Sequence, residues 1–152
     1  MSQIIVQISL TVLLLVICLW ISFVDFRERR IPDMASLPLI CAGLVLSGYA
    51  TEIGLPDRLI GMGLGFLIFW AIGEVYFRMR GNEALGLGDA KLYAAAGAWL
   101  GWSYLPEVLL IATLSGLLFA ALRPQSRQEG LAFGPWLAAG MVLSWFHQLF
   151  VS

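Results

Sequence analysis

The feature that most constrains this chain is an uncharged apolar stretch near its start, at residues 4–24. About 20 apolar residues in a helix cross the hydrocarbon core of a bilayer, so this stretch is long enough to span it. The rest of the chain is similar, since 60% of its 152 residues are hydrophobic and only 12% are charged. Soluble domains contain about 25% charged residues. These values exclude a soluble globule, a disordered chain, a coiled coil and a basic nucleic-acid-binding protein. They predict an all-α integral membrane protein.

Five further apolar stretches, at residues 34–50, 59–77, 92–102, 108–122 and 131–151, bring the predicted membrane helices to six. The second is short for a span, and the fourth is too short unless it starts near Ala90 or tilts. Neither an internal repeat nor a long linker divides the chain. Residues 1–152 are therefore expected to form one membrane-embedded domain.

The basic residues predict an orientation. The loops after the first, third and fifth stretches contain most of the nine Lys and Arg residues: Arg27, Arg29, Arg30, Arg78, Arg80, Lys91, Arg123 and Arg127. Only Arg58 falls on the other side. Because Lys and Arg concentrate in cytoplasmic loops, we expect the basic end of the bundle to face the cytoplasm and both termini to lie outside it.

Asp25 directly follows the first apolar stretch, at the predicted C-terminal end of a helix. The helix dipole disfavours a carboxylate there. Three arginines follow within five residues. From its position alone, the simplest interpretation of Asp25 is a juxtamembrane ion pair with one of them.

Asp89 follows Gly86 and Gly88 and opens the fourth stretch. The simplest interpretation is an N-cap carboxylate, which is common at helix starts. The two glycines indicate a role beyond capping, because they permit an irregular backbone and the close approach of another chain. Irregular backbone at membrane depth is tolerated where it lines a watery cavity, so we expect such a cavity beside Asp89.

Asp25 and Asp89 are thus predicted at the same depth and on the same face. Two neighbouring carboxyl groups can share one proton, so that one activates a water molecule and the other polarises a carbonyl. This is the chemistry of aspartic proteases, which requires neither a metal nor a cofactor. The dipoles at the two helix ends favour the proton on Asp25 and an ionised Asp89.

The remaining candidates have simpler interpretations. Glu74 lies one turn before Arg78 and is expected to pair with it. Cys18 and Cys41 are isolated and read as small apolar residues, while the single histidine, His147, is expected at the membrane interface.

Four segments of the chain, in order, resemble those of type IV prepilin peptidases. Residues 25–33 (DFRERRIPD) resemble the D-x₅-I-P-[ND] segment after the family's first core helix, and residues 83–92 (EALGLGDAKL) resemble its E-x-M-G-x-G-D-x-K-L segment. Residues 96–106 are similar to the stretch that follows, and residues 133–140 (FGPWLAAG) to a late F-G-P-F-L-A-x-G segment. A G-x-G-D sequence alone is a weak signal, but four ordered segments are a strong one.

The resemblance implies a GxGD-type aspartyl protease of the bacterial inner membrane. Such an enzyme cleaves the basic leader from type IV prepilins or pseudopilins at the cytoplasmic face. The family's two catalytic aspartates fall on Asp25 and Asp89. The expected partners are the prepilin substrate and the lipid bilayer; no metal, cofactor or nucleic acid is expected.

Further residues are candidates for shaping the site or binding substrate: Gly86, Gly88, Glu83, Lys91 and Pro135. The two glycines give the backbone room to place Asp89, while Glu83 and Lys91 flank it and are expected to tune it. Pro135, after Gly134, is expected to kink the last helix.

Many bacterial members of this family also carry an N-terminal region with a Cys-rich, zinc-binding loop, and they N-methylate the trimmed pilin. This sequence begins almost directly at the first core helix and contains two cysteines, so the resemblance does not extend to methylation. Two other functions fit the two aspartates. A small transporter or channel would use them as ion sites and show ion flux. A non-catalytic pilus or secretion assembly subunit would tolerate Asn at both positions.

Overall fold

The computed structural model describes residues 2–81, 86–122 and 132–151. These ranges contain six α-helices: α1 (Ser2–Glu28), α2 (Asp33–Leu46), α3 (Leu55–Arg80), α4 (Leu87–Leu100), α5 (Leu105–Leu122) and α7 (Gly134–Val151). Short 3₁₀ turns lie at Ser47–Tyr49 and Trp102–Tyr104. Since no strand occurs in these ranges, the predicted all-α class is confirmed.

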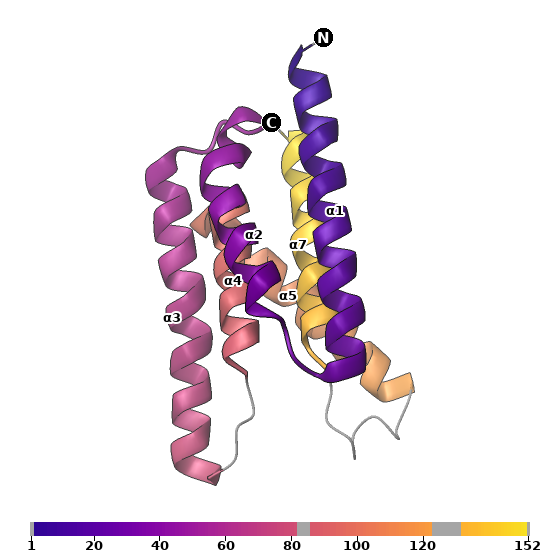
Figure 1. The fold of residues 1–152 in the computed structure, drawn as a ribbon. Helices are drawn as coiled ribbons and strands as arrows, with labels where there is room; N and C mark the ends of the chain where they lie inside the picture. Colours follow the sequence, from indigo (N-terminus) through magenta and orange to yellow (C-terminus); the bar gives the residue numbers. More distant parts are fainter. Residues whose placement is uncertain (1, 82–85, 123–131, 152) are drawn as a thin grey trace.

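Successive helices run in opposite directions through one bundle, as Figure 1 shows. Both chain termini lie at the upper end of this view. The C-terminal end of α1 and the N-terminal ends of α4 and α7 meet at the lower end. The alternation places the segments containing Asp25 and Asp89 at the same end of the bundle, as the sequence predicts.

Three helices are long and apolar enough to cross a membrane: α1, α3 and the segment Trp102–Leu122 that includes α5. They contain 27, 26 and 21 residues, whereas Asp33–Tyr49 is a shorter apolar helix. α2 and α4 contain only 14 residues each. By length and composition the structure supports three of the six predicted spans, and a crossing by α2, α4 and α7 stays a prediction.

Two helices begin earlier than hydropathy predicts. α3 starts at Leu55, with a proline in its first turn, and ends at Gly81, whose φ of 70° is typical of a C-cap glycine. α4 starts at Leu87 rather than at residue 92. Its first five residues include an aspartate and a lysine, which lower the hydropathy without preventing helix formation. Asp89 therefore lies inside the helix.

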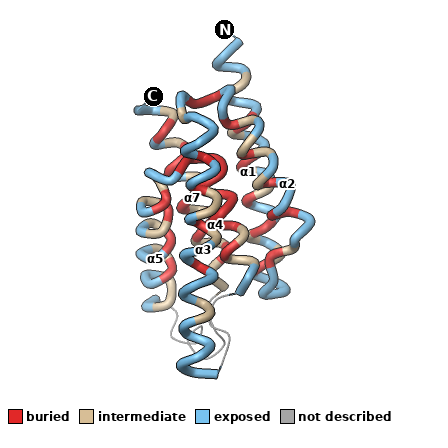
Figure 2. The backbone as a smooth tube through the Cα atoms, turned by 90° about the vertical axis from the view of Figure 1, so that its left-hand side faces the viewer, coloured by how far each residue is buried: buried red, intermediate tan, exposed pale blue. Residues whose placement is uncertain are grey.

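α4 forms the centre of the bundle and packs against α2, α3 and α7. Every residue from 92 to 100 is buried, as the red core of Figure 2 shows. Most of these residues are Ala or Gly, which lets neighbouring backbones come close. A Cβ atom added to Gly61 of α3 would lie 2.7 Å from the Gly97 carbonyl oxygen, and one added to Gly65 would lie 2.6 Å from the Tyr93 carbonyl oxygen.

α7 is fixed on the other side of α4 by aromatic packing. The rings of Trp99 and Trp145 pack edge to face at 5.4 Å between centroids. The Trp145 indole also donates a hydrogen bond of 2.9 Å to Thr11 Oγ1 on α1. These contacts tie α1, α4 and α7 together, and these are the three helices that approach the two aspartates.

Arg58 is buried rather than exposed in an outer loop, with 7% of its surface accessible. Its guanidinium donates hydrogen bonds to the Leu44 carbonyl oxygen at 2.8 Å and to Ser47 Oγ at 3.2 Å. The last carbonyls of a helix lack donors within the helix, and a cation near them is favourable. Arg58 thus caps the C-terminal end of α2 from α3.

We expect Arg58→Ala to lower the free energy of unfolding by about 1–3 kcal/mol, because buried carbonyl oxygens lose their donors. Thermal unfolding of the purified protein in detergent measures the change. Arg80→Ala, at the exposed last residue of α3, is the matched control. Equal melting temperatures for the two variants would contradict a capping role for Arg58.

Candidate functional site

Asp25 lies in the last turn of α1 and is only 5% exposed. Its Oδ2 accepts a hydrogen bond of 3.1 Å from the backbone N–H of Gly134, the first residue of α7. The interpretation of Asp25 as a surface ion pair is therefore wrong. The first N–H groups of a helix lack partners within it and favour a negative charge. Packing has brought the N-terminal end of α7 onto the Asp25 carboxyl group.

Asp89 is the third residue of α4 and is half-buried. The N-cap is Gly86, so the prediction of an Asp89 N-cap is wrong. The backbone N–H of Asp89 donates to the Gly86 carbonyl oxygen at 3.1 Å. The charge of Asp25 acts on the Asp89 carboxyl group, so the two side chains lie within electrostatic reach of each other.

Ile31 lies between the first turns of α4 and α7. A Cβ atom added to Gly88 would lie 2.9 Å from Ile31 Cβ, and one added to Gly134 would lie 3.1 Å from Ile31 Cδ1. The Ile31 side chain is 9% exposed. Ile31 is therefore the packing element that spaces the two helix starts, and both glycines leave room for it. The sequence singled out Gly88 but assigned no role to Ile31.

Lys91 connects α4 to the start of α2. Its Nζ lies 2.6 Å from Oδ1 of Asp33, the first residue of α2. The pair is partly exposed to solvent, with 25% of the Lys91 side chain and 60% of the Asp33 side chain accessible. Lys91 was predicted to flank Asp89 and tune it, and the structure assigns its ammonium group to Asp33.

Pro135 is the second residue of α7. Proline fits the first turn of a helix, because the N–H group it lacks has no partner there. The prediction that Pro135 kinks the last helix is therefore wrong, since this helix begins beside it. Gly134, which the sequence analysis did not choose as a site residue, supplies the N–H for Asp25. The available signal was a Gly-Pro pair directly before an apolar helical stretch.

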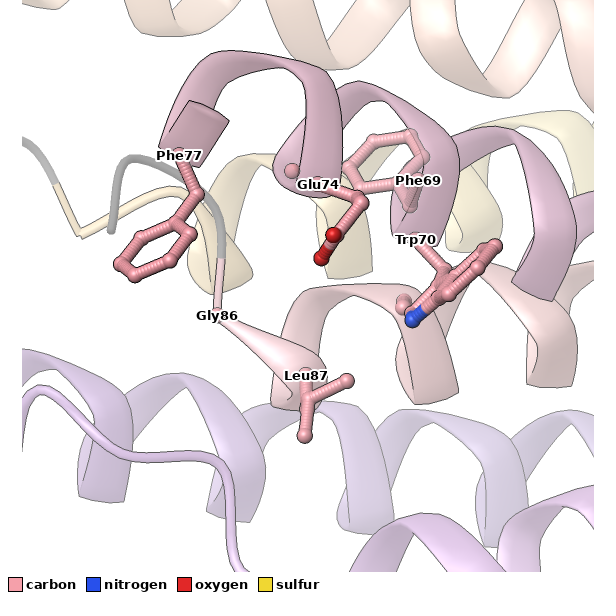
Figure 3. Close-up of a pocket in the computed structure, with 8 residues that line it drawn as sticks. Phe69, Trp70, Glu74, Phe77, Gly86 and Leu87 are labelled. Atoms are coloured by element: carbon pink, nitrogen blue, oxygen red, sulfur yellow. The ribbon is translucent and has the colours of Figure 1, made fainter. Parts of the chain in front are cut away.

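A cavity of about 440 Å³ opens between α3 and the start of α4, as Figure 3 shows. Its lining comes from α3 and from the start of α4: Phe69, Trp70, Gly73, Glu74, Phe77, Gly86, Leu87 and Ala90. Glu74 also forms the predicted ion pair with Arg78, at 2.8 Å. The cavity expected beside the Gly-x-Gly-Asp segment is therefore present. Glu83, the other candidate in that segment, lies outside the described residues.

These elements define a class of site in a helical membrane protein. Two carboxyl groups from separate helices lie within electrostatic reach of each other, Asp25 at the N-terminal end of α7 and Asp89 in the first turn of α4. A cavity opens between α3 and the start of α4. Such a pair can share and exchange one proton.

Comparison with known proteins places the chain in a family. The model of the type IV leader peptidase family matches residues 12–121, and the chain belongs to this family. It is 42% identical over 136 residues to a prepilin leader peptidase/N-methyltransferase of Dickeya chrysanthemi, covering 82% of this chain and 48% of that protein. It is 40% identical over 129 residues to one of Escherichia coli strain K12, covering 83% of this chain and 57% of that protein.

A third relative of the same description, from Burkholderia pseudomallei strain K96243, is 44% identical over 123 residues, covering 78% of this chain and 40% of its own length. The chain thus spans about half the length of the curated relatives it matches. No solved structure matches the chain. The family resemblance noted in the sequence is confirmed.

Proposed function

We propose that this protein is an aspartic endopeptidase that removes the leader from type IV prepilins or pseudopilins. The observation that carries the proposal is the buried Asp25 carboxyl group on the N-terminal end of α7, within electrostatic reach of Asp89. Membership of the type IV leader peptidase family supports the same substrate class. The proposal covers leader removal only, because the chain spans about half of relatives whose names include two activities.

In the proposed mechanism, one aspartate activates a water molecule while the other, protonated, polarises the scissile carbonyl. From the sequence, the proton is expected on Asp25, because the dipole at the C-terminal end of a helix disfavours an ionised carboxyl group. The hydrogen bond from Gly134 places the Asp25 carboxyl group at the N-terminal end of α7, just as Asp89 lies at the N-terminal end of α4. The helix dipoles therefore no longer favour the proton on one aspartate over the other. We therefore assign the proton to the pair, which titrates as one coupled unit.

The substrate would enter as a helix from the bilayer, with its leader at the basic end of the bundle. The scissile peptide has to unwind locally, because a helical amide is not open to attack by water. Coexpression with candidate prepilins tests the function, and leader removal appears as a shift of the pilin band on a gel. Ion flux in liposomes without any cleavage would favour the transporter alternative.

The proposed location is the bacterial inner membrane, with the aspartates on the cytoplasmic side and both termini outside. We expect Met79→Cys to react with an impermeant maleimide only from the cytoplasmic side, and Glu52→Cys only from the outer side. Both positions are exposed at opposite ends of α3. Cys18→Ala and Cys41→Ser provide the background. Labelling of both positions from one side would contradict the proposed crossing of α3.

A further inference from the structure

We propose that the cavity between α3 and α4 is a subsite for one cationic side chain, Lys or Arg, of the polypeptide substrate. The proposal rests on the proposed peptidase function and assigns a task to Glu74 that neither the dyad nor the family match provides. Glu74 directly follows the uncharged stretch 59–73 of α3, and an ionisable residue within a membrane span is functional by default.

The carboxyl group of Glu74 points into the cavity, between Trp70 and Phe77, as Figure 3 shows. Leu87 of α4 lies opposite. The Glu74 side chain is 38% exposed, so it remains accessible to a ligand that enters the cavity. The cavity therefore combines one negative group with aromatic and aliphatic walls.

This combination matches a cation at the end of an apolar stem. The faces of Trp and Phe rings attract Lys ammonium and Arg guanidinium groups. A carboxylate accepts a charge-assisted hydrogen bond from either group. The methylene groups of a Lys or Arg side chain pack on apolar surface while the charged end reaches a polar partner. An anionic side chain would be repelled by Glu74, and a purely apolar one would offer its carboxylate no hydrogen bond.

The cavity lies at the first turn of α4, the turn that also contains Asp89. Gly86, Leu87 and Ala90 line it from this turn. A side chain held by Glu74 would therefore fix the register of the substrate backbone relative to Asp89. Fixing the register in this way raises the fraction of bound substrate in a reactive position.

The present partner of Glu74 does not prevent this use. Arg78 lies one turn away on the same helix, with its Nε 2.8 Å from Glu74 Oε1, and 76% of its side chain is exposed. Exposed ion pairs four residues apart on a helix are weak, so a substrate cation exchanges with Arg78 at little cost.

The test compares Glu74→Gln with Arg78→Gln, because the two variants remove opposite halves of the same ion pair. The probes are a fluorescent leader peptide containing Lys and Arg and a set of its derivatives, each with one basic residue replaced by Gln. We expect Glu74→Gln to raise KM about tenfold for the parent peptide and also to lower kcat, because less of the bound substrate then lies in the reactive register. One derivative lacks the basic residue that Glu74 binds, and for this peptide Glu74→Gln and wild type should have equal KM values. Arg78→Gln frees the Glu74 carboxylate and should leave KM equal or lower.

A structural role for the ion pair predicts a different pattern. If Glu74→Gln and Arg78→Gln raise KM to the same extent, or if Glu74→Gln affects every peptide equally, the subsite assignment is overturned. Glu74→Lys adds a second readout: it should prefer a peptide with Glu at the selected position, and failure to do so would also count against the subsite.

Binding measurements separate this proposal from the proposed function. The same peptides are titrated into protein carrying Asp25→Asn, with and without Glu74→Gln, so that no cleavage is needed. A tenfold weaker binding that depends on one basic residue supports the subsite even if wild-type protein cleaves nothing. If the wild-type protein cleaves the peptide but binding does not depend on its charges, the peptidase proposal is supported and the subsite proposal is wrong.

Discussion

Replacing either Asp25 or Asp89 by Asn should abolish leader cleavage while the protein still inserts and folds. Asn keeps the shape of the side chain, and its carbonyl oxygen can still accept the hydrogen bond that Gly134 donates to Asp25. What it loses is proton exchange, and general acid–base catalysis by one group is worth about 10²–10⁴-fold in rate. Because water activation and carbonyl polarisation each need one carboxyl group, neither aspartate can replace the other.

The measurement is the gel shift of a coexpressed prepilin, with membrane insertion checked by size-exclusion chromatography in detergent. Glu107→Gln is the matched acidic control. Glu107 belongs to the first turn of α5 at the opposite end of the bundle, where it contacts His147 at 2.9 Å. Full activity of either aspartate variant would refute the dyad, and intact pilus function with both variants would favour the non-catalytic alternative.

The second large effect is expected at Gly134. A Cβ atom added there would lie 2.5 Å from Asp25 Oδ2 and 3.0 Å from its Cγ, closer than real Cβ contacts occur. Asp25 or α7 must therefore shift, and the N–H···carboxylate hydrogen bond is lost or bent. Misplacement of a reacting group by about 1 Å costs on the order of 100-fold in rate. We expect Gly134→Ala to lower kcat by about that factor.

In the same variant, the higher helix propensity of Ala offsets part of the cost of this shift, so we expect a much larger loss of kcat than of stability. Activity and melting temperature therefore separate a positioning role from a merely structural one. Gly63→Ala on α3 is the control, since a Cβ atom there meets nothing within 4 Å. Equal kcat values for the two Ala variants would show that Gly134 does not position Asp25.

The sequence predicted those parts of the molecule that depend on local composition. The long uncharged stretch gave α1, and the basic residues predicted the same end for Asp25 and Asp89, as the alternating helices bear out. The start of α4 was missed by five residues, because hydropathy penalises Asp89 and Lys91 although both lie among the first five residues of the helix. α4 also lacks an amphipathic pattern, since neighbours cover it on all sides.

The contacts that build the site could not be predicted in the same way. Gly134 and Asp25 are 109 residues apart, and their hydrogen bond depends on how α7 packs beside α1. No periodicity in either helix contains that information. The same holds for Arg58. Its charge was used only to predict the membrane orientation, and its hydrogen-bond partners on α2 depend on how α2 and α3 pack side by side.

The unequal helix lengths have a consequence for the surrounding lipid. At 1.5 Å per residue, the 27 residues of α1 extend about 40 Å, whereas the 14 residues of α2 extend only about 21 Å. The hydrocarbon core of a bilayer is about 30 Å thick, so an α2 that crosses the membrane, as predicted, would present lipids with a hydrophobic surface that is too short. Lipids respond to such mismatch by local thinning. The headgroup region would then dip toward Asp33 and the aspartate pair, and water would reach the scissile bond from the side of the bundle without a pore through it.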